Sequence, residues 1–78
     1  MKNIEIVDAE YKDGYNIFIK FNDGKSGIVN LENILWGKVF EPLKDVLHFK
    51  NFEISKISNT IEWKNGADLA PEFLYNLI

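Results

Sequence analysis

The chain has 78 residues, of which 46% are hydrophobic and 14% aromatic, and it contains no cysteine. This length fits one domain over residues 1–78, and the missing cysteines exclude disulfides, thiolate zinc sites and thiol nucleophiles. The net charge is −3 and the cations are all lysines, spread evenly along the chain, so direct binding of nucleic acid is not expected. No segment has the length and apolar character of a signal peptide or membrane span, and we expect a cytoplasmic protein.

Two Asp-Gly pairs divide the first part of the chain into three alternating segments. Because Asp and Gly tolerate the backbone angles of tight hairpin turns, the pattern predicts an antiparallel meander. Its strands are expected at Asn3–Tyr11, Tyr15–Phe21 and Lys25–Asn30. The alternation changes phase near Ile6–Val7, which predicts a bulge or bend in the first strand.

The middle of the chain is irregular. One helical turn is expected over Leu31–Trp36, ended by Gly37, and a short helix is expected to begin at Pro42. Leu43, Val46 and Leu47 are spaced as a helical stripe.

A second hairpin is predicted from Phe52–Ile57 and Thr60–Lys64, with its turn at Ser58-Asn59. The tail from Asp68 is expected to form a helix with Asp68 as the N-cap. Its apolar stripe should pack on the sheet, and it consists of Leu69, Phe73, Leu77 and the neighbouring Leu74 and Ile78. The sequence therefore predicts an α+β fold: a small, mainly antiparallel sheet (the meander plus the second hairpin) with a short central helix and a packed C-terminal helix.

Residues for catalysis are few. His48 is the single histidine, no serine lies in a nucleophile-elbow context, and neither a phosphate-binding glycine loop nor a metal-ligand spacing occurs. We therefore expect no enzymatic activity, no metal and no cofactor.

The aromatic residues are more numerous than so small a core needs. Trp36 precedes Gly37 and Trp63 lies three residues before Gly66, so both stand at the ends of elements. A tryptophan there is either a lid on the core or an anchor for a partner, and the sequence leaves both interpretations open. Open sheet edges also permit a homodimer by strand addition.

Three segments together resemble the small bacterial family of unknown function DUF2442. They are YNIFIKFNDGKSGIVNL (15–31), LWGKVFEPLKD (35–45) and IEWKNGADLAPEFLY (61–75), the last similar to a W-x-N-G-A-D-x-x-P-E-x-L-Y signature. The resemblance covers nearly the whole chain and implies a small α+β fold with no known enzymatic activity. It also implies a gene often placed beside that of a second small family, DUF4160, in a toxin–antitoxin-like arrangement.

From these observations we expect a protein–protein interaction module, the antitoxin-like or regulatory member of such a pair. The expected partner-binding residues are Trp36, Trp63, Asn65, Asp68, Glu72 and Tyr75. One alternative is a small-ligand-binding domain or enzyme that uses Trp63, Asp68 and Glu72. The other is a part of a DNA-binding regulatory complex, in which the partner would supply the DNA contacts.

Overall fold

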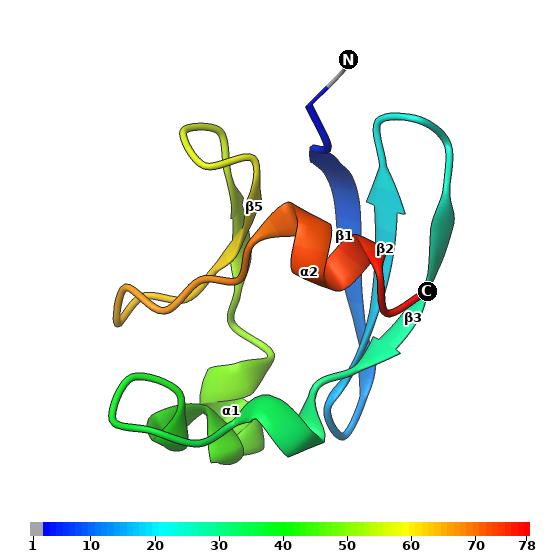
Figure 1. The fold of residues 1–78 in the computed structure, drawn as a ribbon. Helices are drawn as coiled ribbons and strands as arrows, with labels where there is room; N and C mark the ends of the chain where they lie inside the picture. The colour runs from blue at the N-terminus through cyan, green and yellow to red at the C-terminus, as the bar shows by residue number, and fades with distance from the viewer. Residues whose placement is uncertain (1–2) are drawn as a thin grey trace.

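The computed structural model of the chain describes residues 3–78 and contains two antiparallel sheets with short helical segments (Figure 1). The fold is α+β, as predicted. The first sheet has the order β1-β2-β3, and the second pairs β4 with β5. In chain order the elements are β1 (Ile6–Asp13), β2 (Asn16–Phe21), β3 (Ser26–Asn30), η1 (Glu32–Ile34), η2 (Glu41–Lys44), α1 (Val46–Phe49), β4 (Glu53–Ser55), β5 (Thr60–Glu62) and α2 (Pro71–Tyr75).

The meander follows directly from the local sequence. Gly14 and Gly24 have φ angles of 51° and 93°, a region that glycine enters without steric cost. Along β2, alternate side chains from Ile17 to Phe21 are buried, as expected for a strand with one face on the core. The predicted irregularity in the first strand is confirmed, because the register with β2 shifts between Ile6 and Asp8.

The second hairpin forms where it was predicted, but as a separate sheet packed beside β1. Outside the strand ladders, a backbone hydrogen bond of 2.9 Å joins the Ile6 N–H to the Asn59 carbonyl. Asn59 has a φ of 59°, a left-handed conformation that asparagine tolerates better than most residues.

The central segment covers one end of the core. Leu43 in η2 and Phe49 in α1 are buried, and the Asp45 side chain caps α1 by accepting a hydrogen bond from the Leu47 N–H at 3.0 Å. The cap separates η2 from α1, so the helical stripe predicted through Leu43 does not continue to Leu47, which is exposed.

The C-terminal helix begins later than predicted. Asp68 is not its N-cap: this residue forms an isolated antiparallel bridge with Glu62, and the N-cap is Ala70. The reason is Pro71, which disfavours the helical conformation at the residue before it; Ala70 accordingly has φ −59° and ψ 137°. Pro71 is then the first helical residue, where its missing N–H costs nothing.

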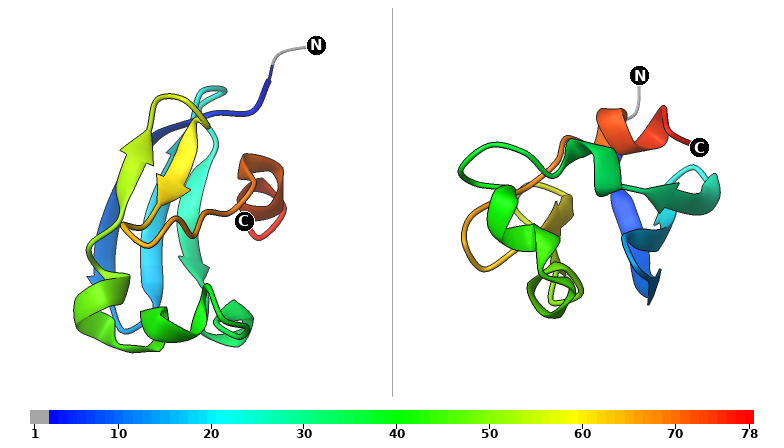
Figure 2. Two further views of the ribbon diagram at one scale, coloured as in Figure 1. Left: turned by 90° about the vertical axis from the view of Figure 1, so that its left-hand side faces the viewer. Right: turned by 90° about the horizontal axis from the view of Figure 1, so that it is seen from below.

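This later start changes the face that α2 presents to the sheet. Leu74 is fully buried and the Tyr75 ring packs edge-on against Phe21, with ring centres 5.0 Å apart. Phe73 and Leu77, which were predicted to pack, are exposed. In the left view of Figure 2, α2 lies against one face of the β1-β2-β3 sheet.

The core lies between the inner face of this sheet, α2, the second hairpin and the central segment. Its buried hydrophobic members are Ile6, Ile17, Ile19, Phe21, Val29, Leu31, Leu35, Leu43, Phe49, Ile61, Trp63, Ala67 and Leu74. Within residues 3–78, no helix has the length and apolar character needed to cross a membrane.

Candidate interaction groove and the Trp63 pocket

An apolar groove opens between the segment around η1 and the segment that leads into α2. It encloses about 310 Å³ and its walls are entirely hydrophobic side chains: Ile34, Trp36, Phe40, Leu69 and Phe73. We call this set the Trp36 groove. Of the residues that the sequence singled out for partner binding, Trp36 is the one found here.

Trp36 is held outward by its local backbone. Its N–H donates to the Ile34 carbonyl at 2.9 Å, and Gly37 follows with a φ of 89°, so the chain turns sharply after the tryptophan. The side chain is 73% exposed, and Phe73 across the groove is 41% exposed. Two large aromatic side chains therefore border a hollow that no described residue fills.

The segments that form the groove carry an excess of negative charge. Residues 31–42 and 68–78 contain four acids, Glu32, Glu41, Asp68 and Glu72, against the single cation Lys38. All five side chains are exposed. An apolar groove formed by segments with this charge is complementary to an apolar partner segment that carries basic residues.

Trp63 is a core residue, contrary to its predicted place among the anchors. It is 3% exposed, and its indole N–H donates to the Phe49 carbonyl at 2.6 Å. Its ring also packs against Phe49 and Phe52, with ring centres 5.8 Å and 6.3 Å apart. Trp63 thus joins the second hairpin to the end of α1 and offers almost no surface to a partner.

Asn65 is also explained by internal contacts. Its amide N–H₂ donates to the Val39 carbonyl at 2.8 Å, and its Oδ1 accepts from the Ala67 N–H at 3.1 Å. Gly66 completes this turn with a φ of 90°. The W-x-N-G-A signature therefore ties the turn after β5 to the central segment.

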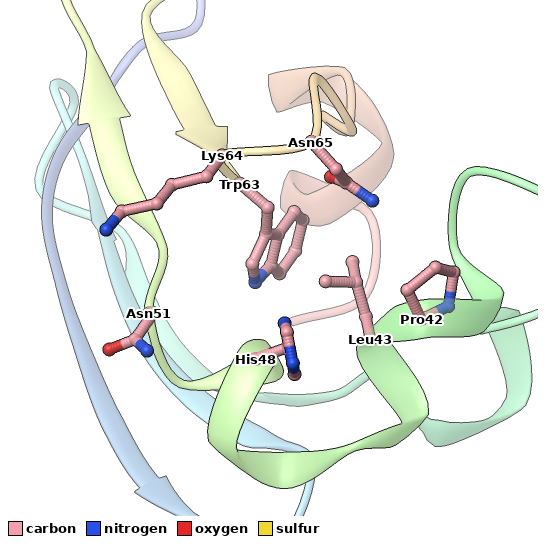
Figure 3. A pocket seen from close by; sticks show the side chains of 7 residues that line it. All are labelled: Pro42, Leu43, His48, Asn51, Trp63, Lys64 and Asn65. Carbon is pink, nitrogen blue, oxygen red and sulfur yellow. The ribbon is translucent and has the colours of Figure 1, made fainter.

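A second hollow of about 390 Å³ lies beside Trp63 (Figure 3). It is lined by Pro42, Leu43, His48, Asn51, Trp63, Lys64 and Asn65. The Trp63 indole lies at its centre, with Leu43 and His48 facing it from the central segment. The amides of Asn51 and Asn65 each donate to a backbone carbonyl. Lys64 is the lysine in the lining, and its side chain is exposed.

Tyr75 also forms contacts with other residues of the chain. Its hydroxyl donates to the Asp23 carboxylate at 2.6 Å, and the Lys25 ammonium lies 4.0 Å from its ring centre and donates to its carbonyl at 3.1 Å. The hydrogen bond lowers the pKa of Asp23 and raises the pKa of Tyr75, since it is strongest when the carboxylate is charged and the phenol is protonated. This contact fastens α2 to the β2–β3 turn.

Asp68 and Glu72 are exposed and line neither hollow. The structure therefore does not unite Trp63, Asp68 and Glu72 in one concave site. Within residues 3–78, no three His, Asp or Glu side chains come close enough to hold a metal ion.

Most of the residues that line the groove were not predicted from the sequence to bind a partner. Phe73 and Leu69 were predicted to pack on the sheet, and no binding role was predicted for Ile34 or Phe40. The signal that identifies Phe73 is Pro71: with the helix starting there, Leu74 takes the buried position and Phe73 turns outward.

Comparison with known proteins gives one assignment. The family model described as "Protein of unknown function (DUF2442)" matches residues 6–78. No curated protein and no solved structure matches the chain. Because the match spans almost the whole chain, this protein belongs to the DUF2442 family.

Proposed function

We propose that this protein is a small protein-interaction module and that the Trp36 groove is its contact surface. The observation that carries the proposal is the 73% exposure of Trp36 at the border of a hollow lined by hydrophobic residues. Tryptophan and other aromatic residues dominate binding energy where a partner can desolvate them. A contiguous exposed apolar surface rimmed by polar residues is also typical of interaction sites.

The charge of the segments that form the groove indicates what kind of partner it suits. We expect an apolar segment that carries Lys or Arg, because the groove segments carry four acids and one lysine. We propose that this partner is a small protein of the DUF4160 family made together with the chain in the bacterial cytoplasm. In this pairing the chain is the antitoxin-like or regulatory member.

A binding titration with this partner tests the proposal. Calorimetry with the purified DUF4160-family protein encoded beside the gene should give saturable binding. Trp36→Ala or Phe73→Ala should weaken it by about 30-fold or more, the loss typical of a hot-spot residue. Leu47→Ala is the matched control, because Leu47 is also exposed but lies outside the groove. Equal affinity for all of these chains would refute the groove as the contact surface.

Small-ligand binding beside Trp63 is a second candidate function, favoured by the hollow of about 390 Å³. Its lining combines the apolar side chains of Leu43 and Trp63 with the exposed Lys64, a combination that suits a small anion with an apolar body. Benzoate is a simple probe. A saturable NMR shift of the Trp63 indole N–H that Lys64→Ala abolishes would support this function, and an unmoved resonance would exclude benzoate-like ligands.

A further inference from the structure

The outer edge of β3 has no partner strand among the described residues. In Figure 1, β3 stands at the border of its sheet, with β2 on one side and no strand on the other. The Lys25 carbonyl accepts a hydrogen bond from the Phe21 N–H at 2.8 Å, and the Leu31 N–H donates to the Tyr15 carbonyl at 3.0 Å. Odd-numbered residues therefore face β2, and the alternation of an antiparallel ladder turns the backbone groups of the even-numbered ones outward.

The edge of β3 has no feature within the strand that prevents pairing with another chain. Natural edge strands are usually kept from such pairing by lysine, proline, bulges or a covering element. The five residues Ser26–Asn30 include no charge and no proline, and their register with β2 is continuous. The opposite edge of the same sheet does have such features, because β1 has a bulge and is flanked by β4 and β5.

Apolar side chains lie on both faces of the open edge. Ile28 is 57% exposed on the outer face, directly across from Phe18 on β2. On the inner face, Ile78 lies over Gly27: a Cβ at Gly27 would be 2.6 Å from the Ile78 Cγ2. Ile78 and its neighbour Leu77 are both exposed. A strand added here would cover apolar surface on both faces as well as satisfy the backbone.

We propose that β3 pairs antiparallel with β3 of a second copy of this chain, so that one sheet continues across a two-fold symmetric dimer. The outward-facing residues read Ser26, Ile28 and Asn30, a polar–apolar–polar order that is symmetric about Ile28. A two-fold axis at Ile28 places isoleucine opposite isoleucine and Ser26 opposite Asn30, with no like charges facing each other. The edge is thus complementary to itself.

Molar mass of the full chain in solution tests this inference. Light scattering after size exclusion should show the wild type approaching twice its 9.1 kDa chain mass as concentration rises to about 1 mM, the range suited to small interfaces. Ile28→Pro removes the outward N–H and leaves the pairing of Gly27 and Val29 with β2 intact. It should weaken dimerisation about tenfold or more, because each copy loses a hydrogen bond across the axis.

A second variant and a control keep the test decisive. Ile28→Lys serves if the proline variant does not fold, which circular dichroism shows, and Ile57→Lys is the control because Ile57 is 97% exposed in the β4–β5 turn. The inference also predicts that the amide protons of Ser26, Ile28 and Asn30 exchange more slowly at high concentration. A wild type that stays monomeric over this range, or a dimer that survives in the folded Ile28 variants, would overturn it.

Discussion

The two tryptophans show how differently the same residue type is used within one small domain. Trp63 is enclosed and hydrogen-bonded to Phe49, whereas Trp36 is mostly in solvent. Burial of an indole removes a large apolar surface from water, and its N–H then needs a partner. Trp63 therefore contributes to stability, and Trp36 is available for binding.

Replacing each tryptophan by phenylalanine should separate these roles. Trp63→Phe leaves the Phe49 carbonyl without its donor and opens a cavity, so we expect a loss of about 2–4 kcal/mol in the free energy of unfolding. Trp36→Phe should change it by no more than about 0.5 kcal/mol, as for most exposed substitutions. Urea unfolding followed by far-UV circular dichroism measures both, and similar losses in the two variants would contradict the assignment.

The Tyr75–Asp23 contact should make stability depend on pH. Because the pKa of Asp23 is lowered in the folded state, its contribution is present above the unfolded value of about 4 and is lost as pH falls through the folded pKa. The raised pKa of Tyr75 gives a contribution that is present below about 10 and is lost as pH rises through the folded pKa.

Tyr75→Phe removes this contact at its donor. The difference in thermal midpoint between wild type and Tyr75→Phe should be largest near neutral pH and should shrink below about pH 4. Tyr11→Phe is the control, since the Tyr11 hydroxyl donates to the Gly14 carbonyl and not to a carboxylate. A Tyr75→Phe difference that is the same at pH 3 and pH 7 would show that Asp23 is not the partner.

At the scale of elements, α2 is short and depends on tertiary contacts. It has five residues, too few for a helix to be stable by itself. It is held to the sheet by the buried Leu74 and by the ring of Tyr75, which packs on Phe21. Just after the helix, the side chain of Ile78 packs over Gly27. Gly27 has a particular role, because any larger residue there would meet Ile78.

Gly27→Ala should therefore destabilise the protein by about 1–3 kcal/mol, the usual cost of overpacking. Adding Ile78→Ala should recover part of this loss, because the shorter side chain makes room for the new Cβ. A double-mutant cycle by urea unfolding, at concentrations too low for association, should give a coupling of about 1 kcal/mol. Strict additivity would mean that the two residues do not meet.

Local sequence signals predicted the strands correctly, but they did not predict where α2 begins. The Asp-Gly turns and the alternation of β2 act between near neighbours, so the meander could be placed from the sequence alone. For the last helix, two local signals conflicted: Asp68 favoured an early start and Pro71 a later one. The restriction on Ala70 prevailed, and it decided which apolar residues face the sheet.

The candidate site was harder to predict because burial of the tryptophans is a tertiary property. Trp36 and Trp63 both stand near a glycine at the end of an element. What distinguishes them is that Trp63 reaches a carbonyl 14 residues away. Nor does the sequence alone reveal that the polar side chains of Asn65 and Tyr75 each form a hydrogen bond to a distant part of the chain.

At the scale of the whole molecule, the residues of the family signature mainly hold segments together, and two exposed aromatic side chains, Trp36 and Phe73, border the Trp36 groove. We propose that this groove contacts the partner. The two indole N–H resonances test it most directly, because Trp63 provides an internal control in the same spectrum.

During a titration of the labelled chain with the DUF4160-family partner, the Trp36 indole resonance should shift or broaden to saturation. The Trp63 resonance should stay in place, since its N–H is buried against the Phe49 carbonyl. Binding that moves Trp63 and leaves Trp36 unchanged, or the absence of any binding, would contradict the account.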